Sequence, residues 1–340
     1  MAKSSINKVR NLKQKDEIWD VAVRPARTWI KSRENDPYRP WYTLVVSDDD
    51  RIIRHDIGKD KPSAEEILES LFKAMRRPMM GAGRKRRPVK VLFDDKELYD
   101  ELSPVLTEIG VKAEKKTTLI YANALRKELD RRFSKDDDVA SLIKIPGVTV
   151  PLLNKIFKAA AAYYRLAPWE LIPPEEFAME IRYPAEAEPR YAIIIGRGGE
   201  SLGLSINDSL DDLKAFMEHA RFNKSISSKF STISFTFEGN FLLSFDDLDA
   251  IETYGWDIPN ERAYPSIMRY SPEDKLFSPT SKDIYWLEGA LPAITEFFTY
   301  DYDSDEFFAN FGETQIEYNT IVHTLGGVEH VIITLPILIE

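Results

Sequence analysis

Residues 41–57 read WYTLVVSDDDRIIRHDI and have the pattern of a β-hairpin. The runs 41–46 and 51–57 are rich in β-branched, aromatic and other apolar residues, which favour strands. The segment between them, Ser-Asp-Asp-Asp at 47–50, is typical of a turn because Ser and Asp side chains hydrogen-bond to nearby backbone there. We therefore predict two antiparallel strands joined by a turn.

Helices and strands alternate after this hairpin. Ser63 and Glu66 form a capping-box pattern, and apolar residues at helical spacing continue to Met75. The same reasoning predicts a strand, a helix, a strand and a helix at 89–93, 98–109, 111–115 and 122–133. The order of this first block is ββαβαβα.

The C-terminal part of the chain shows a similar order. A strand at 190–195, a Gly-rich turn and a return strand at 202–206 precede a helix that starts near Ser209. Further strands and helices follow, and the chain ends in a hairpin. We therefore predict an α/β fold with mixed sheets, made of two similar ββαβαβα halves that arose by internal duplication.

Composition divides the chain into segments. The first 15 residues contain five Lys and Arg and no acid, and four prolines lie between 173 and 189. These features predict a flexible tail and an irregular linker. We expect four parts: a basic flexible tail at 1–18, an N-terminal α/β domain at 19–140, a helical and Pro-rich connector at 141–189, and a C-terminal α/β domain at 190–340.

Composition also excludes several classes of protein. The 340 residues include no cysteine, which excludes disulfide scaffolds, Cys-based zinc sites, iron–sulfur clusters and thiol nucleophiles. No apolar run approaches the roughly 18 residues of a membrane span, and the start lacks the apolar segment of a signal peptide. We expect a cytoplasmic protein with no membrane partner.

The net charge of −10 conceals an asymmetry. Residues 1–140 carry 31 Lys and Arg against 25 Asp and Glu, whereas residues 141–340 carry 15 against 31. Such polarity bears on partners rather than on the fold. A basic N-terminal surface would meet nucleic acid or the acidic surface of another copy.

Several short motifs carry a resemblance to a known family. They include Arg39-Pro40-Trp41, Ala160-Ala161-Ala162-Tyr163-Tyr164-Arg165 with Pro168-Trp169, Gly203-Leu204-Ser205 and Gly255-Trp256. From about Trp19 onward the chain resembles an uncharacterised bacterial family of domain-of-unknown-function proteins, whose relatives sometimes adjoin a SEC-C zinc-binding module. That module needs Cys and His ligands, so this chain lacks it. The resemblance supplies no active site.

The first block also resembles a ribonuclease H-like or integrase core. In such cores a strand ends in a carboxylate and a helix follows, as in residues 87–111 here. The resemblance implies two-metal phosphodiester cleavage, with Asp48, Asp94 and Glu128 as catalytic residues, and with Asp48 and Asp94 as ligands of Mg²⁺ or Mn²⁺. The neighbouring carboxylates Asp49, Asp95 and Asp130 are alternatives. Without this activity we expect no cofactor.

Each of these carboxylates also has an ordinary structural interpretation. Asp48 lies in a predicted hairpin turn, where Asp is common. Asp94 and Asp95 precede a helix and are suited to cap it. Glu128 lies on a charged helix face.

The densest basic run lies between the first helix and the strand at 89–93. Six cations around two glycines are suited to contact a phosphate backbone, and a solvated loop is the alternative. The candidate nucleic-acid-binding residues are Arg76, Arg77, Arg84, Lys85, Arg86 and Arg87.

Near the C-terminus, acidic and aromatic residues alternate. Such a segment either docks on a basic protein surface or forms a loop held by its aromatic residues. The candidate partner-binding residues are Asp301, Tyr302, Asp303, Asp305 and Phe307.

The sequence thus favours a non-catalytic binding or scaffold protein with a basic N-terminal and an acidic C-terminal surface. The alternative is a metal-dependent or degenerate ribonuclease H-like nuclease. Expected partners are protein and, through the 76–87 loop, nucleic acid.

Overall fold

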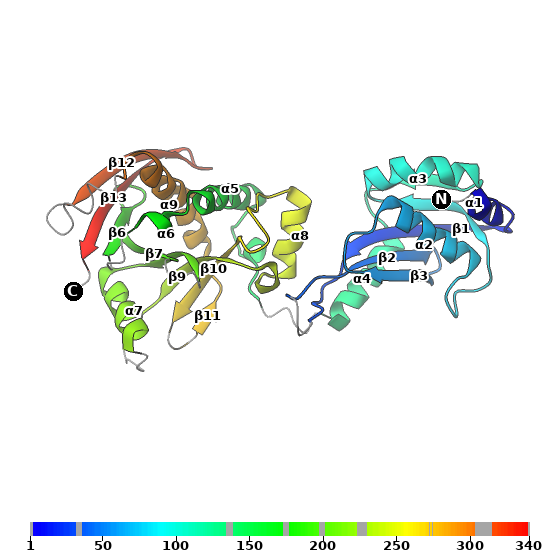
Figure 1. The fold of residues 1–340 in the computed structure, drawn as a ribbon, viewed down its shortest axis with the longest axis horizontal. Helices are drawn as coiled ribbons and strands as arrows, with labels where there is room; N and C mark the ends of the chain where they lie inside the picture. The colour runs from blue at the N-terminus through cyan, green and yellow to red at the C-terminus, as the bar shows by residue number, and fades with distance from the viewer. Residues whose placement is uncertain are drawn as a thin grey trace. The chain divides into compact units, whose positions relative to one another are not determined.

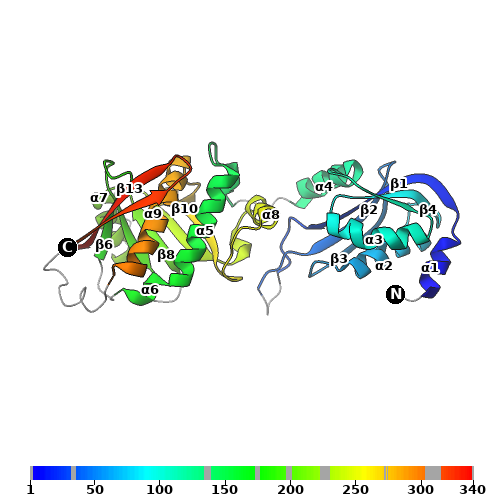
Figure 2. The ribbon, with the colours of Figure 1, turned by 90° about the horizontal axis from the view of Figure 1, so that it is seen from above.

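The computed structural model describes residues 3–31, 36–133, 139–172, 177–196, 201–222, 230–271, 273, 275–302 and 315–338. The chain divides into two compact units, Met1–Asp137 and Asp138–Glu340 (Figures 1 and 2). Within the described residues, no helix combines the length and the apolar character needed to cross a membrane.

The N-terminal unit is built on a five-stranded mixed sheet with the order β3-β2-β1-β4-β5. Its strands are β1 (Gln14–Pro25), β2 (Trp41–Ser47), β3 (Ile52–Gly58), β4 (Arg87–Phe93) and β5 (Lys112–Lys115). β2 is antiparallel to β1 and β3, whereas β4 is parallel to β1 and β5. The β2–β3 hairpin confirms the prediction made from residues 41–57.

Helices cover both faces of this sheet. They are α1 (Lys3–Arg10), α2 (Ala64–Arg76), α3 (Lys96–Glu108) and α4 (Ile120–Phe133). α1, α2 and α3 share one core with Val21 and Val45 of the sheet. The start of α4 packs on the opposite face against Ala22 and Leu44 (Figure 1). Neighbouring strand residues point to opposite faces, so β1, β2 and β4 each contribute to both cores.

The basic N-terminal segment is not a flexible tail over its described residues, which corrects the prediction for 1–18. α1 buries Val9 completely, and β1 starts at Gln14 and takes the centre of the sheet. β1 lacks the alternating pattern of a half-buried strand because helices cover both of its faces. The order after α1 is therefore βββαβαβα rather than ββαβαβα.

The C-terminal unit contains an eight-stranded antiparallel sheet with the order β11-β10-β9-β8-β7-β6-β13-β12. Its strands are β6 (Phe177–Arg182), β7 (Arg190–Ile195), β8 (Leu202–Asn207), β9 (Thr232–Glu238), β10 (Tyr264–Ser271), β11 (Lys275–Phe277), β12 (Ile316–His323) and β13 (Val328–Leu338). Strands β6 to β11 follow one another in space as in sequence, and the predicted terminal hairpin, β12–β13, joins the sheet beside β6.

One long helix organises the core of this unit. α9 (Ser281–Tyr300) packs against α5 (Val150–Leu166) and against the hairpin strands β12 and β13. The other helical elements are α6 (Pro168–Leu171), α7 (Leu210–Phe222), α8 (Phe245–Tyr254) and the 3₁₀ turns η2 (Leu142–Lys144) and η3 (Asn240–Leu242). α9 is buried on most of its surface, which explains its nearly continuous apolar sequence.

The two sheets differ in size and in strand direction, so the predicted similarity of two duplicated halves is not shown by the structure. The order of elements along a chain does not determine strand direction. β4 follows α2 and joins β1 in parallel, whereas β9 follows α7 and returns antiparallel to β8. A helix between two strands is compatible with both arrangements.

The predicted connector at 141–189 belongs to the C-terminal unit. It supplies α5, whose Ile156 and Phe157 are completely buried, and it supplies β6. The backbone N–H groups of Leu142 and Ile143 donate to Asp247 of α8 at 2.8 and 3.0 Å. The prolines around β6 made this stretch look irregular, although β6 itself contains none.

Candidate functional site

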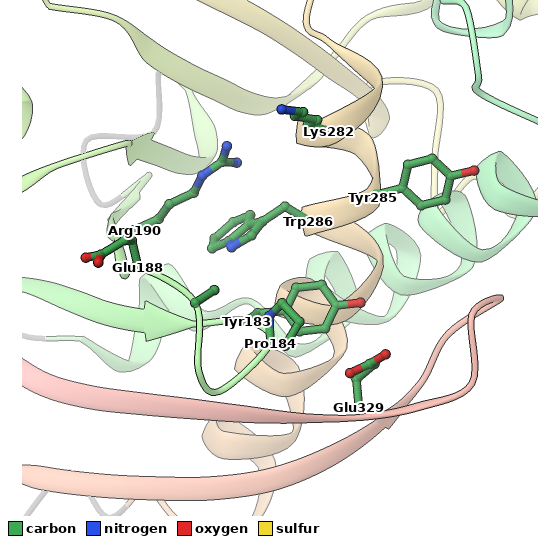
Figure 3. Close-up of a pocket in the computed structure, with 9 residues that line it drawn as sticks. Tyr183, Pro184, Glu188, Arg190, Lys282, Tyr285, Trp286 and Glu329 are labelled. Atoms are coloured by element: carbon green, nitrogen blue, oxygen red, sulfur yellow. The ribbon is translucent and has the colours of Figure 1, made fainter.

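A pocket of about 480 Å³ lies beside the first turns of α9 in the C-terminal unit (Figure 3). This volume is within the range of small-molecule sites. The lining residues come from β7 and the segment before it, from α9 and from β13: Tyr183, Pro184, Ala187, Glu188, Arg190, Lys282, Tyr285, Trp286 and Glu329.

The local sequence of α9 determines one wall. Thr280 and Asp283 form a capping box that sets the start of the helix. Lys282 and Trp286 are four residues apart and therefore share a helix face. A Cβ atom on Gly289, one turn further, would lie 2.2 Å from Cζ of Tyr183. Glycine at this position therefore lets the Tyr183 ring pack against α9.

Arg190 is held in a network of charges around the buried Asp283. Its Nε lies 3.0 Å from Oδ1 of Asp208, and its Nη2 donates to Oδ1 of Asp283 at 3.2 Å. Its guanidinium carbon lies 5.1 Å from the centroid of the Trp286 ring, a cation–π contact. The guanidinium is therefore fixed before any ligand arrives.

A second arginine completes the network. Arg269 donates to both oxygens of Asp283, at 2.7 and 2.8 Å. Burial alone would raise the pKa of Asp283. The hydrogen bonds from Arg269 and Thr280 outweigh burial and lower this pKa to about 2. Asp283 is therefore an anion that anchors both arginines.

Two hydrogen-bond donors at the pocket have no partner. Nη1 of Arg190 and Nε1 of Trp286 are buried and make no hydrogen bond. A buried donor without an acceptor costs about 1–3 kcal/mol. Both nitrogens are covered by neighbouring atoms, so an acceptor group would recover that free energy once the side chains that cover them shift.

The remaining charges lie on both sides of the Trp286 ring. Figure 3 shows Lys282 and Arg190 on one side with Glu188 beside Arg190, and Glu329 beyond Tyr183 on the other. Burial raises the pKa of Tyr183 to about 12, and the nearby charges of Glu288 and Glu329 add to this shift. The Tyr183 hydroxyl is therefore neutral at physiological pH.

The lining offers charged groups, aromatic rings and N–H donors that suit the binding of a small molecule. Among the lining residues there is no Ser, Thr, Cys or His that would form a nucleophile and base pair. Charged groups, indole and phenol rings and N–H donors can orient a small molecule.

The three predicted catalytic carboxylates have other contacts in the N-terminal unit. Oδ2 of Asp48, in the β2–β3 turn, accepts the N–H of Ile18 at 3.2 Å. Asp94 follows β4 and forms an ion pair with Arg24 of β1. Glu128 lies half-buried on α4. Within the described part of the chain, no three His, Cys, Asp or Glu side chains are grouped so that they could hold a metal ion.

Asp20, which the sequence reasoning missed, lies near Asp48 and Asp94. It is 1% exposed in β1, and its Oδ2 accepts the N–H groups of Tyr121 and Ala122 at 2.9 and 3.1 Å, whereas its Oδ1 has no partner. Burial raises the pKa of Asp20, and the charges of Asp94 and Asp48 raise it further. An Asp inside the apolar run 18–23 was the available signal.

The basic 76–87 loop divides into internal and exposed residues. Nε of Arg86 donates to Glu17 at 2.6 Å, its guanidinium carbon lies 5.4 Å from the Trp19 ring centroid, and the residue is 2% exposed. Arg87 donates to the carbonyls of Leu12 and Ile109. Arg76 is half-buried, whereas Arg77, Arg84 and Lys85 are exposed. These last three remain available to a partner.

The acidic segment is described only at its start. Asp301 is exposed and ends α9. Tyr302 packs against Phe297 and Phe298, and its hydroxyl donates to the carbonyl of Leu171 at 3.2 Å. Asp303, Asp305 and Phe307 lie outside the described residues.

The sequence reasoning did not predict the pocket. Its residues come from three separate stretches, 183–190, 282–286 and position 329. One local signal was available, the placement of Lys282, Trp286 and Gly289 on one face of a predicted helix. Nothing local indicated that Arg190 would lie against that face.

Comparisons with known proteins give two domain matches. Residues 5–130 match DUF6930 and residues 154–316 match DUF7309, each described as a domain of unknown function. No curated protein matches the chain. One similar solved structure is a chain of the cryo-EM structure of a simian T-cell lymphotropic virus intasome in complex with PP2A regulatory subunit B56 gamma. That match has 12% identity and a TM-score of 0.24, covers 58% of this chain and 78% of that chain, and is too distant to show a shared fold. The chain thus carries two domains of unknown function, DUF6930 in its N-terminal unit and DUF7309 in its C-terminal unit.

Proposed function

We propose that the protein is a non-catalytic binding protein whose C-terminal pocket holds a small organic molecule with an acceptor group such as a carboxylate. The observation that carries this proposal is the pair of buried, unpartnered donors, Arg190 Nη1 and Trp286 Nε1. Both residues line the same pocket, and Lys282 adds a positive charge beside them. Charge-assisted hydrogen bonds to a carboxylate are stronger than those to a neutral acceptor.

Preorganisation supports the same conclusion. Asp208, Asp283 and the Trp286 ring hold the Arg190 side chain, so ligand binding need not order it. A donor that is already fixed saves the entropy of immobilising a long side chain. The aromatic rings beside it would bury the apolar body of the ligand.

The test is calorimetric titration of the full chain with 3-phenylpropionate, an aromatic carboxylate. We expect binding, and Trp286→Phe should weaken it about fivefold because it keeps the ring and removes one donor. Trp256→Phe is the matched control, since Trp256 is also buried with an unpartnered Nε1 but lies outside the pocket. No binding at about millimolar ligand, or equal losses in both variants, would contradict the proposal.

The exposed cations of the 76–87 loop support a second contact surface, as the charge asymmetry of the sequence suggests. Arg77, Arg84 and Lys85 would bind a polyanion such as single-stranded RNA, with affinity that falls steeply with salt. Neutralising all three should abolish a salt-dependent shift in fluorescence anisotropy, and unchanged anisotropy would exclude this surface. The acidic segment from Asp301 onward is proposed as the contact for a basic protein partner.

One observation favours the second candidate, a metal-dependent or degenerate ribonuclease H-like nuclease. Asp20 has an unpartnered carboxylate oxygen and lies close enough to Asp94 for charge repulsion to raise its pKa. The ion pair between Arg24 and Asp94 opposes it, because a metal ion would have to displace the guanidinium. Soaking a crystal of the protein in manganese and locating the metal by anomalous scattering would distinguish the nuclease from the binding protein. A peak between Asp20 and Asp94 would support the nuclease, and an intact ion pair without a peak would exclude it.

A further inference from the structure

The pocket beside α9 has opposite charges at its two ends. Lys282 lies in the first turn of α9 near Arg190, and Glu329 lies on β13 beyond the Tyr183 ring (Figure 3). The Trp286 and Tyr183 rings stand between these ends. Glu188, a further lining carboxylate, lies beside Arg190. A ligand that fills the pocket would therefore meet Lys282, Arg190 and Glu188 at one end, then aromatic rings, then Glu329 at the other.

Most of the charge on Arg190 is already balanced inside the protein. Asp208 and Asp283 both contact its guanidinium, so it offers a directed donor more than a net charge. Lys282 and Glu329, in contrast, form no ion pair within the described residues. With Glu188, which also lines the pocket, these side chains carry the charges that a bound molecule would meet, and Lys282 and Glu329 are the two that lie at opposite ends.

A ligand with a single charge fits only half of this arrangement. A simple anion would place its carboxylate near Lys282 and Arg190, but it would also partly desolvate Glu329 with nothing to compensate. A simple cation would satisfy Glu329 and leave the two buried donors of Arg190 and Trp286 without an acceptor. A molecule with both charges compensates every one of these groups.

We propose that the pocket binds a zwitterion, an amino acid or a short peptide. Its carboxylate lies at Arg190, Trp286 and Lys282, its ammonium group at Glu329, and its apolar side chain against the aromatic rings. This inference rests on the proposed function, since it names the class of ligand for the same pocket.

Gly289 contributes to the shape that this ligand requires. The Tyr183 ring packs so closely on α9 that a Cβ atom at position 289 would come within 2.2 Å of Cζ of the ring. Gly289→Ala would push the ring away from α9 and so change the wall between the two charged ends. The position of the Tyr183 ring between the charged ends therefore depends on glycine at position 289.

The test uses matched peptides titrated into the full chain by calorimetry. The probes are L-phenylalanine, L-alanyl-L-phenylalanine and L-alanyl-L-alanyl-L-phenylalanine, each with its N-acetyl form and its C-terminal amide. Acetylation removes only the ammonium charge and amidation only the carboxylate charge. At the length that binds best, we expect either change to weaken binding about tenfold.

Two variants test which protein side chain contacts each charged end of the ligand. Glu329→Gln should weaken the zwitterion about tenfold and leave the N-acetyl form unchanged, and Lys282→Met should weaken both. Glu252→Gln, an exposed acid on α8 outside the pocket, should have no effect. Retained far-ultraviolet circular dichroism would show that each variant is folded.

The outcomes separate this inference from the proposed function. If the N-acetyl forms and 3-phenylpropionate bind as tightly as the zwitterions, the pocket holds an anion and the zwitterion inference is overturned. If the amides bind best, it is overturned too. If neither the peptides nor 3-phenylpropionate bind, both the zwitterion inference and the proposed function are contradicted.

Discussion

At the scale of single residues, burial determines which charged side chains are available for function. Arg84, Lys85 and Arg86 are adjacent in a basic run, yet Arg84 and Lys85 are exposed whereas Arg86 is 2% exposed and paired with Glu17. A buried guanidinium needs a carboxylate because the desolvation of an unpaired charge is prohibitive. The acid that meets this need lies 69 positions away in the sequence.

Substitution of Arg86 separates a structural role from a binding role. Arg86→Gln removes the ion pair with Glu17, which keeps the hydrogen bond from Trp19 and the more distant cations of Lys15 and Arg51. The free energy of unfolding of the N-terminal unit should therefore fall by about 3 kcal/mol. Arg84→Gln, two positions earlier and exposed, should change it by less than about 0.5 kcal/mol. Urea unfolding followed by Trp fluorescence measures both, and equal effects would contradict the structural role of Arg86.

Asp283 makes the stability of the C-terminal unit depend on pH. Its pKa is about 2 in the folded chain, below the ordinary value of 3.8, so folding favours the ionised form. This contribution, about 2 kcal/mol, is complete above the unfolded pKa and is lost as the pH falls toward 2.

Asp283→Asn tests this dependence. The variant should be less stable than the wild type at about pH 6, and the gap should narrow as the pH falls to about 2. Thermal unfolding across this range measures the gap. A difference in stability that did not change with pH would contradict the role of the charge.

At the scale of elements, the type of most segments was predictable and their pairing was not. Residues 41–57 formed the predicted hairpin, and the capping box of Ser63 and Glu66 marks the start of α2 as expected. The length of strand β1 was underestimated. Both of its faces are buried, so its sequence lacks the alternation of apolar and polar residues that marks a half-buried strand. Capping and turn signals act within a few residues, whereas pairing depends on residues far apart.

Strand β8 contains an example of such a distant constraint. Gly203 has a φ of +149°, and a Cβ atom there would lie 2.0 Å from the carbonyl oxygen of Phe235 on β9. Gly203→Ala should therefore lower the free energy of unfolding by more than about 3 kcal/mol.

Gly326→Ala is the matched control for that substitution. The nearest atom to its Cβ would be Oγ1 of Thr324 at 3.6 Å, an ordinary contact. We expect a change within about 1 kcal/mol. Chemical denaturation of both variants gives the comparison, and similar losses would contradict the close approach of β8 and β9.

At the scale of the whole molecule, the chain forms two units with a boundary at Asp137 and Asp138. The sequence placed the start of the last domain at residue 190, after the prolines. The structure assigns α5 and β6, both before residue 190, to the core of the C-terminal unit. β6 lies between β7 and β13, so the hairpin β12–β13 is attached to the rest of the sheet through it.

Two fragments test this division. Residues 138–340 should fold cooperatively by themselves, because they contain the whole antiparallel sheet and both of its central helices. Residues 190–340 should not fold, since they lack α5 and β6. Heat capacity measured through thermal unfolding checks both, and a cooperative transition in the shorter fragment would contradict the assignment.

Local features of this protein could be predicted from the amino-acid sequence alone. Turn residues, capping boxes and apolar spacing act over a few residues, so many helices and the hairpins were predictable. The folded structure was needed to show which strands pair, that Arg86 is internal, that Asp20 lies near Asp94, and that Arg190 faces Trp286. Each of these joins residues far apart in sequence, and such contacts depend on the packing of the whole chain, to which each short segment contributes only a small part.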